Sequence, residues 1–398
     1  MIRIVFLIAS LRRGGAETQL TLLVRGLDHT RFHCTVVTIY DGGDLISALD
    51  GIENVEVVSV SKGGRRDSLA SLVRLTHVIR DRKPDIVHGY LDSSNVLALV
   101  TGKRVKARIV WGVRSSDMGT ANLDAVSRLY RRLGALLSSR ADLVIANSSA
   151  GRTFVTSIGY PPERVVTIPN GFDTDRFAPD PAGRARARAG WGIVGDTPVV
   201  GLVARIDPIK DHPTFLRAAA LLVERMPEVK FACIGGGGTS EYERELRQLA
   251  ADLSLTDHLT WVGETLDMPA AHNGLDVASL VSTSEGFANA VGEAMSCAVP
   301  CVVTDVGDSA EIVGDTGLVV RPGDPEALSD AWQRILTCSP AERAKLGARA
   351  RARIVDHFSV TSLVNRSTAA LLSLVEEPES PGNTDEGRTQ AKIDDRCA

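Results

Sequence analysis

The sequence predicts an α/β protein built from two doubly wound parallel-sheet domains. Short apolar runs rich in Val and Ile alternate with longer amphipathic stretches along most of the chain. The alternation stops in a stretch rich in turn residues near 175–195 and then begins again. Because a strand, a helix and a further strand join by a right-handed crossover, each series favours a parallel sheet with helices on both faces.

The first series contains strands whose composition suits burial on both faces. We expect these strands at 2–9, 34–39, 55–60, 85–88, 107–111 and 143–146. The intervening amphipathic stretches predict helices at 17–27, 68–82, 122–139 and 150–157. The apolar run 4–9 is too short for the core of a signal peptide, and its basic pair follows the run, so we interpret it as part of a buried first strand.

The second series repeats the pattern. We expect strands at 198–204, 229–234, 259–262, 277–281 and 300–304, and helices at 214–225, 240–253, 289–296, 325–336 and 340–356. The predicted division is an N-terminal domain at 1–178, a linker at 179–196, a C-terminal domain at 197–356, a last helix at 357–375 that packs back on the first domain, and a disordered tail at 376–398. Ligands of such folds bind where strand carboxyl ends and helix amino ends converge, so the cleft between the domains is the expected site.

Composition excludes several classes of protein. The chain has 398 residues with 44% hydrophobic and 24% charged side chains, which is ordinary for a globular protein. No apolar run reaches the roughly 18 residues that a membrane-spanning helix needs. The six cysteines are scattered without a CxxC pair, which argues against a disulfide framework or a zinc site. We therefore expect a reduced, cytoplasmic protein.

Charge is unevenly distributed although the net charge is only −4. Residues 1–180 carry an excess of Lys and Arg, and the remainder carries an excess of Asp and Glu. A basic half suits peripheral contact with an anionic membrane or an acidic acceptor. Ordinary solvated charge is the alternative. Nothing in the pattern indicates a nucleic-acid partner.

Two glycine-rich loops follow predicted strands and open predicted helices. Gly14 and Gly15 lie in the first, and Gly235 begins the second. Glycines at such positions let a phosphate approach backbone amides at a positive helix end. Neither loop has the GxGxxG spacing of dinucleotide-binding folds, and a plain tight turn is the alternative for each.

Two carboxylates eight residues apart form the most informative element. Glu285 precedes a helix expected from about residue 288, and Glu293 lies one turn inside it. Both carboxylates and the free amides of 287–289 would face one pocket. Carboxylates suit sugar hydroxyls, and helix-end amides suit a phosphate. Two glutamates on a solvated helix face are the alternative.

A third element supplies positive charge. Arg205 and Lys210 follow the first strand of the second series, braced by Pro208. A guanidinium fork and an ammonium group at a strand's carboxyl end can bracket a diphosphate. An exposed loop with ordinary charges is the alternative.

Taken together, these residues resemble glycosyltransferase family 4, which has the GT-B architecture of two Rossmann-like domains facing across a cleft. The resemblance covers nearly the whole chain to about residue 375. Its motifs are Gly14–Glu17, Pro84–His88, Ile168–Asp173, Arg205–Lys210, Glu285 with Glu293, and Thr304–Gly307 with Glu311.

The resemblance implies roles for these residues. Glu293 would hold the ribose hydroxyls of the donor, Glu285 would contact the transferred sugar, and Arg205 with Lys210 would stabilise the diphosphate. The Gly15 amide would approach the diphosphate from the other domain. Further donor-binding positions implied in this way are Gly14, Gly235, Gly263, Phe287, Ala288 and Asn289.

The N-terminal domain carries weaker signals. His88 occupies a position where some family members place a histidine against the donor sugar, and a core histidine at a strand end is the alternative. Arg114 and Asn170 are assigned to the acceptor or sugar side. Two departures from the family pattern also occur: Cys297–Pro300 lacks the usual glycine, and Gly307–Ser309 replaces a Gly-Gly pair.

No metal or cofactor is expected. Asp173 and Asp175 form a formal Asp-x-Asp motif, but they lie in a turn cluster where capping of the turn is the better interpretation. Arg205 and Lys210 would supply the charge that a divalent ion supplies elsewhere.

The predicted function is transfer, with retention of configuration, of a sugar from a nucleotide diphosphate donor to a hydroxyl acceptor. We expect a UDP-sugar donor and a lipid-linked or saccharide acceptor, in the synthesis of a cell-surface polysaccharide or glycolipid. A location in the cytoplasm, at the inner face of the membrane, follows from this. A GT-B phosphorylase or epimerase and a non-catalytic nucleotide-sugar-binding protein are the alternatives.

Overall fold

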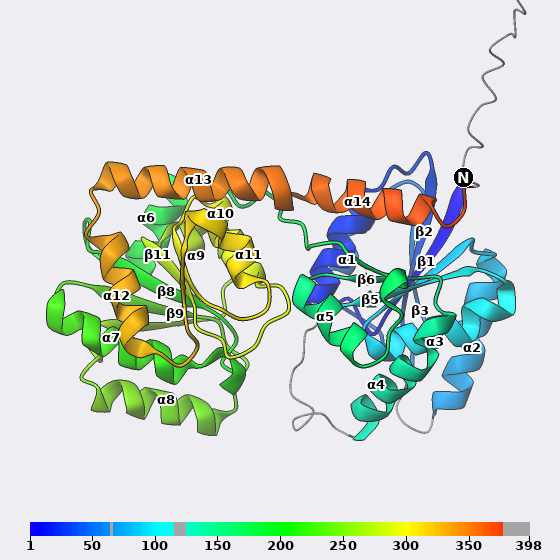
Figure 1. Cartoon of the computed structure of the whole chain (residues 1–398), viewed down its shortest axis with the longest axis horizontal. Coiled ribbons are helices and arrows are strands. Elements are labelled where there is room, and N and C mark those ends of the chain that lie inside the picture. Colours follow the sequence, from blue (N-terminus) through cyan, green and yellow to red (C-terminus); the bar gives the residue numbers. More distant parts are fainter. Residues whose placement is uncertain (64–66, 115–124, 377–398) are drawn as a thin grey trace, which may run out of the picture.

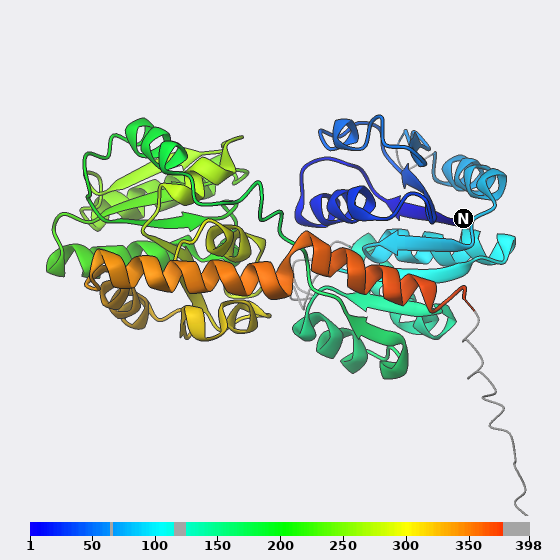
Figure 2. The same ribbon diagram turned by 90° about the horizontal axis from the view of Figure 1, so that it is seen from above.

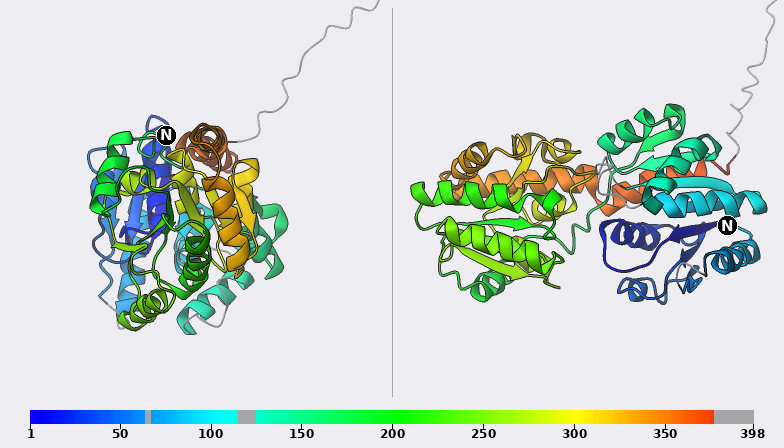
Figure 3. Two further views of the ribbon diagram at one scale, coloured as in Figure 1. Left: turned by 90° about the vertical axis from the view of Figure 1, so that its left-hand side faces the viewer. Right: turned by 90° about the horizontal axis from the view of Figure 1, so that it is seen from below.

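The chain folds into two α/β domains (Figure 1). A computed structural model describes residues 1–63, 67–114 and 125–376. The predicted tail, beyond its first residue, lies outside the described residues, as does the start of the helix expected at 122–139. Figure 3 shows the same two lobes end-on and from below. The expectation of two doubly wound parallel-sheet domains is confirmed.

The N-terminal domain is built on a seven-stranded parallel sheet in the order β3-β2-β1-β4-β5-β6-β7. Its strands are β1 (Ile2–Ile8), β2 (Phe32–Thr38), β3 (Val55–Ser59), β4 (Ile86–Tyr90), β5 (Arg108–Val113), β6 (Leu143–Ala146) and β7 (Val165–Thr167). Its helices are α1 (Gly15–Gly26), α2 (Ser68–Arg82), α3 (Asp92–Gly102), α4 (Ala125–Leu137) and α5 (Ser149–Ser157).

The C-terminal domain repeats the design with a six-stranded parallel sheet in the order β10-β9-β8-β11-β12-β13. Its strands are β8 (Val199–Val203), β9 (Lys230–Ile234), β10 (Leu259–Gly263), β11 (Val277–Leu280), β12 (Cys301–Thr304) and β13 (Leu318–Val320). Its helices are α6 (Pro181–Gly190), α7 (His212–Arg225), α8 (Ser240–Asp252), α9 (Met268–Asn273), α10 (Asn289–Ser296), α11 (Ser309–Val313), α12 (Pro325–Leu336) and α13 (Pro340–Phe358).

Each sheet has one point at which the strand order reverses. In the first sheet this point lies between β1 and β4, and in the second it lies between β8 and β11. Helices on opposite faces leave a crevice at such a switch point, beyond the carboxyl ends of the strands. The loop with Gly14 and Gly15 follows β1, the loop with Arg205 and Lys210 follows β8, and Glu285 follows β11. The topology therefore brings the motifs with the strongest signals to the two crevices.

The central strands are apolar because both of their faces are covered. Residues Ile4 to Ile8 of β1 are at most 1% exposed. One apolar cluster lies on each face of each sheet, which accounts for the continuous Val- and Ile-rich runs read from the sequence.

The stretch 179–196 is not the linker that composition suggested. It contains α6, which packs against α9 of the C-terminal domain. Arg184 and Arg188 on α6 form ion pairs of 2.8 Å and 3.2 Å with Asp276 at the start of β11. The Ala, Arg and Gly content that resembled a linker belongs to a helix held by guanidinium–carboxylate contacts. The first residue of the C-terminal domain therefore lies before this helix.

Other elements were missed because they are short or weakly patterned. Strands β7 and β13 have three residues each, and α9 and α11 have six and five. Such lengths give too few residues for a period to be seen. Helix α3 is buried along most of its length, so it lacks the polar face that marks an amphipathic helix.

The C-terminal helices connect the domains. Figure 2 shows α13 lying along the C-terminal domain and α14 (Val360–Leu372) continuing over the N-terminal domain, where it packs against α1. At the crossing, the Phe172 amide donates to the Phe358 carbonyl at 2.8 Å, and the Val360 amide donates to the Phe172 carbonyl at 3.0 Å. Phe287 packs against both Phe172 and Phe358, with ring centroids 6.0 Å and 5.8 Å away. This aromatic cluster joins the two domains beside the switch points.

None of the helices that the structure describes is both long and apolar enough to cross a membrane.

Candidate active site

A hollow of about 270 Å³ is lined by residues of both domains. The N-terminal domain contributes the amino end of α1 and the residues that follow β5, β6 and β7; the C-terminal domain contributes the loops after β8 and β11. Its side chains of interest are Arg114, Asn147, Asn170, Arg205, Lys210, Glu285 and Asn289, together with the backbone of Gly15 and Phe287.

Local hydrogen bonds bring Lys210 and Glu285 together. The Asp207 carboxylate accepts from the Ile209 amide at 3.0 Å and so caps the turn that carries Lys210. The Thr283 amide donates to the Ile209 carbonyl at 2.9 Å, which ties the loop after β8 to the loop after β11. As a result the Lys210 ammonium donates to Glu285 Oε1.

The Lys210–Glu285 pair is shielded from water. The side chains are 19% and 12% exposed. Ser282 Oγ donates to the same Glu285 oxygen at 2.7 Å. The resemblance assigned these two residues to the diphosphate and to the sugar, and the structure places them in direct contact at one wall of the hollow.

Gly307 supports the Glu285 loop through its lack of a side chain. Its backbone has φ +55°, and a Cβ there would lie 2.4 Å from the Glu285 carbonyl oxygen. The next residue, Asp308, stands where the family pattern has a second glycine. Its carboxylate accepts from the amides of Ser149 and Ala150 at 2.6 Å and 2.9 Å, at the amino end of α5 in the other domain. This departure from the family pattern therefore makes an interdomain contact.

The amino ends of two helices meet at the hollow. The residues that precede α1 and α10 are Gly14 and Ala288, and neither makes a side-chain cap. A Cβ at Gly15 would lie 3.0 Å from Asn289 Nδ2, and Asn170 Nδ2 donates to Asn289 Oδ1 at 2.8 Å. The two positive helix ends, beside Arg205 and Lys210, form an environment suited to an anion, and at the α1 end the Glu17 carboxylate already accepts from its own backbone amide.

Glu293 lies one turn inside α10 and makes a contact that the sequence did not predict. Its Oε2 lies 3.3 Å from Nε2 of the fully buried His272 on α9. The Glu293 side chain is 25% exposed. The histidine thereby fixes the orientation of the carboxylate. Nothing in the sequence linked these two positions, which are 21 residues apart and on different helices.

Phe287, Gly235 and Gly263 act through the backbone. The Phe287 ring belongs to the aromatic cluster between the domains, and the residue also lines the hollow. Gly235 ends β9 with φ +129°, and a Cβ there would lie 2.1 Å from the Ala204 carbonyl oxygen. Gly263 ends β10 with φ +75° and has open space beside it. Gly235 thus permits β9 to end directly against the strand that leads to Arg205.

Arg205 extends toward solvent. Its side chain is 72% exposed, and its guanidinium lies 3.5 Å from the Asp207 carboxylate. An exposed guanidinium at the rim can reorient onto an incoming diphosphate at little cost.

The N-terminal wall of the hollow holds polar atoms that lack partners. Arg114 Nε and Nη1, Asn147 Oδ1 and Asn170 Oδ1 are buried and have no hydrogen-bond partner among the described residues. The Arg114 guanidinium lies over the Tyr90 ring at 4.5 Å. Sequence reasoning missed Asn147; its position directly after a buried strand was the signal available. Buried polar atoms of this kind are costly unless a ligand or water satisfies them.

His88 lies behind this wall. It is 1% exposed and packs between Phe6 and Tyr90, with ring centroids 5.5 Å and 4.7 Å away. Burial, and then the nearby Arg114 charge, lower the pKa of His88 well below its ordinary value. In this structure Arg114, and not His88, presents its polar group to the hollow.

The Asp-x-Asp motif is engaged in the backbone turn. Asp173 Oδ1 accepts from the Arg176 amide at 3.0 Å, which is the capping contact expected from its turn cluster. Within the ranges that the structure describes, no group of three or more His, Cys, Asp or Glu side chains is arranged to hold a metal ion.

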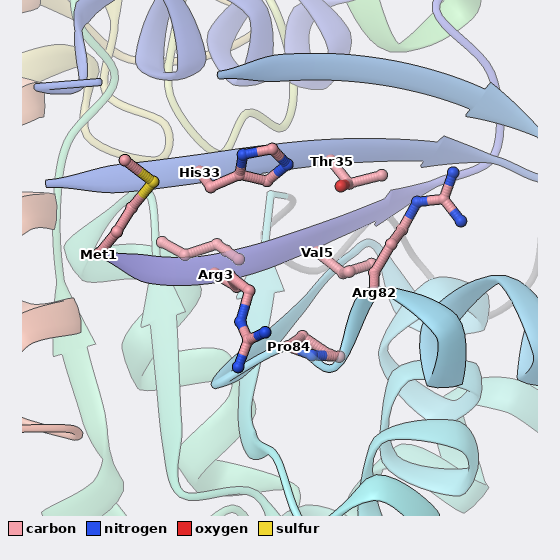
Figure 4. A pocket seen from close by; sticks show the side chains of 8 residues that line it. Met1, Arg3, Val5, His33, Thr35, Arg82 and Pro84 are labelled. Atoms are coloured by element: carbon pink, nitrogen blue, oxygen red, sulfur yellow. The ribbon is translucent and has the colours of Figure 1, made fainter. Parts of the chain in front are cut away.

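A second hollow lies at the opposite edge of the N-terminal sheet (Figure 4). It is lined by Arg3 and His33 from the amino ends of β1 and β2 and by Arg82 at the end of α2. Arg82 pairs with Glu56 through two hydrogen bonds of 2.6 Å and 3.0 Å, and Arg3 lies 3.8 Å from Asp85. Because these cations already have carboxylate partners and lie far from the switch points, this hollow is not the candidate active site.

Comparison with known families matches both domains. Residues 13–176 match the family described as Glycosyltransferase Family 4, and residues 197–338 match the family described as Glycosyl transferases group 1. The two matched segments together span more than half of the chain.

Several proteins of similar sequence are named as glycosyltransferases. A GDP-mannose-dependent alpha-(1-6)-phosphatidylinositol monomannoside mannosyltransferase from Mycolicibacterium smegmatis is 32% identical over 262 residues, which are 63% of this chain and 66%, just under two thirds, of that enzyme. An enzyme of the same name from Mycobacterium tuberculosis is 28% identical over 341 residues, with 82% and 86% covered. A D-inositol 3-phosphate glycosyltransferase from Kineococcus radiotolerans is 29% identical, with 69% and 68% covered.

Solved structures establish the fold. The Anabaena protein HepE in complex with UDP-glucose superposes with a TM-score of 0.81 at 24% identity, covering 94% of this chain and all of that one. A sucrose-phosphate synthase from Thermosynechococcus elongatus superposes with a TM-score of 0.74 at 20% identity, with 94% and 99% covered. The GT-B architecture expected from the sequence is confirmed.

Proposed function

Because the chain belongs to glycosyltransferase family 4, we propose that it is a retaining glycosyltransferase whose nucleotide-sugar donor binds the C-terminal wall of the hollow. The observation that carries this proposal is the Lys210–Glu285 contact at the β8/β11 switch point, flanked by the amino ends of α1 and α10. A diphosphate needs cations and free amides, and a sugar needs hydrogen-bond acceptors; this wall offers both within one hollow.

The donor is proposed to lie along the C-terminal domain in three parts. Glu293, oriented by His272, accepts hydrogen bonds from the ribose hydroxyls. Arg205 and Lys210 meet the diphosphate, and the Gly15 amide meets it from the other domain. Glu285, which accepts a hydrogen bond from Lys210, contacts the transferred sugar.

The chemistry then follows from charge. As the bond between sugar and diphosphate breaks, negative charge grows on the leaving oxygens and positive charge grows on the sugar ring. Arg205, Lys210 and the helix-end amides stabilise the first, and Glu285 stabilises the second. The acceptor hydroxyl enters from the face that the leaving group vacates and gives its proton to the departing diphosphate oxygen, so that the new bond retains configuration at the sugar carbon.

These side chains supply the charge neutralisation that a divalent cation provides in other enzymes. We therefore propose that turnover is independent of added metal. Full activity in excess EDTA is the expected result; loss of activity that Mg²⁺ or Mn²⁺ restores would show that a metal takes part.

The acceptor is proposed to be a hydroxyl on a lipid-linked or saccharide molecule, approached from the N-terminal wall. Arg114, Asn147 and Asn170 line that wall with unsatisfied polar atoms. The relatives named as phosphatidylinositol monomannoside mannosyltransferases act on a glycolipid, which supports a glycolipid acceptor here. Such an enzyme would work in the cytoplasm at the inner face of the membrane.

A panel of nucleotide sugars tests the proposal. The sequence favours a UDP-sugar, whereas the mannosyltransferase relatives use GDP-mannose, so UDP-glucose, UDP-N-acetylglucosamine and GDP-mannose form the first set. A true donor at 100 times its Kd should raise the free energy of unfolding by about 2.7 kcal/mol. Release of nucleoside diphosphate on adding acceptor completes the test. If no nucleotide sugar stabilises the protein, or if inorganic phosphate is a substrate, the transferase assignment fails.

A further inference from the structure

Asp308 links the two domains through its side chain. Its carboxylate accepts from the Ser149 and Ala150 amides at 2.6 Å and 2.9 Å. Its own backbone amide donates to the Gly286 carbonyl at 3.2 Å, next to Glu285. In Figure 1, α5 lies on the side of the N-terminal domain that faces the C-terminal domain. One residue therefore holds the Glu285 loop of one domain and a helix end of the other. We call the pair of bonds to the Ser149 and Ala150 amides the Asp308 contact.

The amino end of α5 needs acceptors from outside the helix, because the first amides of a helix have no intrahelical partner. Ser148 Oγ accepts from the Gly151 amide at 2.9 Å, so this amide is satisfied within the N-terminal domain. The two amides before it are satisfied by Asp308 of the other domain. The positive end of the helix also favours a carboxylate at this place. The N-terminal domain thus completes only part of its own helix cap, and the C-terminal domain completes the rest.

The Asp308 contact is shielded from water, since Asp308 is only 4% exposed. A carboxylate in such a place is costly unless hydrogen bonds satisfy it, and hydrogen bonds to a charged acceptor are stronger than neutral ones. Separation of the domains would return both the carboxylate and the two amides to water. The contact can therefore break and form again without leaving a buried polar group unsatisfied.

Both ends of the Asp308 contact lie beside the hollow. Ser149 is two residues after Asn147, which lines the N-terminal wall. On the other side, Gly286 and Glu285 line the C-terminal wall. A second link runs beside the first, because Ser149 Oγ donates to Glu311 Oε2 at 3.2 Å. The contact therefore fixes how the two walls face each other.

We propose that Asp308 is a positioning residue, whose carboxylate holds the N-terminal wall against the Glu285 loop during transfer. Asp308 is not one of the residues that line the hollow, so it acts through Asn147 and Glu285. Glycine stands at this position in the family pattern and has no carboxylate, so the contact distinguishes this chain from members with that glycine. The role in transfer rests on the proposed function, whereas the contact between the domains does not.

Hydrogen–deuterium exchange resolved to single residues tests the Asp308 contact without donor or acceptor. In the wild type, the Ser149 and Ala150 amides should be protected together with the Gly151 amide. Asp308→Asn removes the charge and leaves at least one amide without an acceptor, so exchange there should be at least about tenfold faster. The Gly151 amide, bound to Ser148 Oγ, should keep its protection. Unprotected Ser149 and Ala150 amides in the wild type, or unchanged exchange in the variant, would overturn the inference.

A second variant breaks the contact from the other side. Ser149→Pro deletes the amide at the first position of α5, where proline is tolerated. The residue before it has extended backbone, with φ −153° and ψ 152°, which a following proline permits. The Ala150 amide should then exchange faster, as in Asp308→Asn, and the double variant should add little because both changes break one contact. Ser149→Ala, which loses only the hydroxyl link to Glu311, is the control and should keep the Ala150 amide protected. Fully additive effects of the two substitutions would contradict the inference.

Steady-state kinetics tests the positioning role. Asp308→Asn and Ser149→Pro should each lower kcat roughly tenfold, because a small misplacement of the walls slows the reaction. The KM for the nucleotide sugar should stay at the wild-type value, since the side chains proposed to hold the donor are unchanged. A purely structural role would lower stability without separating kcat from KM in this way.

The matched control for the kinetics is Asp324→Asn. The Asp324 carboxylate also accepts from an amide at a helix end, that of Ala327 at 3.0 Å, but the helix is α12 of its own domain. This variant should change neither the exchange of the α5 amides nor kcat. A wild-type kcat in Asp308→Asn, or an equal loss in Asp324→Asn, would remove the positioning role.

The two measurements separate this inference from the proposed function. Absence of transfer in the wild type, with the exchange pattern described above, would defeat the proposed function and the role in transfer, while the contact between the domains stands. Normal transfer with exchange that none of the substitutions changes would defeat the inference about Asp308 alone.

Discussion

The two walls of the hollow differ in how their polar groups are satisfied. On the C-terminal wall, Lys210 bonds to Glu285, and Ser282 bonds to the same carboxylate. Glu293 does not line the hollow; one turn further into α10, it lies 3.3 Å from His272. On the N-terminal wall, Arg114 and Asn147 keep buried polar atoms without a partner among the described residues.

This difference indicates which wall has its hydrogen bonds and ion pairs in place before a ligand binds. The C-terminal groups are held in position by neighbours of opposite charge or complementary hydrogen bonding, as expected of a site that must be preorganised for a charged donor. The unpartnered atoms of the N-terminal wall can be satisfied by a bound molecule or by water, which suits a wall that recognises hydroxyls. Substitutions on the two walls should therefore affect stability in opposite ways.

The largest expected effect is on the cationic pair of the C-terminal wall. Arg205→Ala/Lys210→Met should lower kcat/KM by roughly 10³-fold, about 4 kcal/mol, because the charge these groups meet grows as the bond to the sugar breaks. Lys210→Met alone should also lower the free energy of unfolding, since Glu285 at 12% exposure loses its counter-charge. Steady-state kinetics and urea unfolding measure both. Near-wild-type turnover of the double variant would remove this pair from the mechanism.

The free energy of unfolding should depend on pH through one buried histidine in each domain. Burial, and then the Lys210 charge, lower the pKa of His212 to about 4 from an ordinary value of 6.5. The folded chain then binds fewer protons than the unfolded chain between these values. His212 therefore leaves the free energy of unfolding unchanged above pH 6.5. As the pH falls toward 4, the same group lowers this free energy by about 3 kcal/mol at most.

His88 in the N-terminal domain acts in the same direction, because its pKa is also lowered by burial. Urea unfolding between pH 7 and pH 4.5 measures the combined loss. His212→Gln should flatten the curve in part and leave the contribution of His88. An unchanged curve in this variant would show that His212 is not the group that titrates.

Truncating a side chain of the N-terminal wall should lower the activity without lowering the free energy of unfolding. Asn147→Ala should lower kcat/KM by about tenfold, equivalent to about 1.4 kcal/mol, while the free energy of unfolding stays the same or rises. Its matched control is Asn273→Ala, because Asn273 is equally buried but bonds to Asp180, Ala178 and Pro269.

The Asn273 variant should lose on the order of 1–3 kcal/mol of stability and keep its kcat/KM. If Asn147→Ala destabilises the protein as much as Asn273→Ala does, then the two walls do not differ in the way described.

The smallest effect concerns backbone strain beyond the site. Ala298 stands where the family pattern has glycine, and its φ is +59°. Ala298→Gly should raise the free energy of unfolding by about 1 kcal/mol, because an L-residue in the left-handed region is strained. The reference substitution is Ala220→Gly in the interior of α7, which should lower it by about the same amount. Thermal or urea unfolding shows whether each variant is more or less stable than the wild type.

Much of this molecule could be predicted from its sequence. Buried parallel strands leave continuous Val and Ile runs, so β1, β8 and β11 were found, and the motif loops that follow them could be assigned to the carboxyl edges of the sheets. Helix α10 begins at Asn289 as expected, so Glu285 lies in the loop and Glu293 inside the helix.

The remainder depends on contacts between residues far apart in the chain. No local pattern connects His272 to Glu293, or Asp308 to the amino end of α5. Asn147 carries no motif, and only the packing of β6 places it in the hollow. Helix α6 was misinterpreted as a linker because the ion pairs of Arg184 and Arg188 are with Asp276, a residue far along the chain.

Calorimetric titration of free nucleoside diphosphate tests the central claim, that the side chains of the C-terminal domain, and not the polar side chains of the N-terminal wall, hold the donor nucleotide. UDP and GDP are titrated into the wild type, Glu293→Gln, Glu285→Gln and Asn147→Ala, without sugar or acceptor. Glu293→Gln should weaken binding about tenfold, because the ribose contact is present in the ground state. Glu285→Gln and Asn147→Ala should bind as the wild type does. Loss of affinity in Asn147→Ala, with affinity retained in Glu293→Gln, would contradict the account.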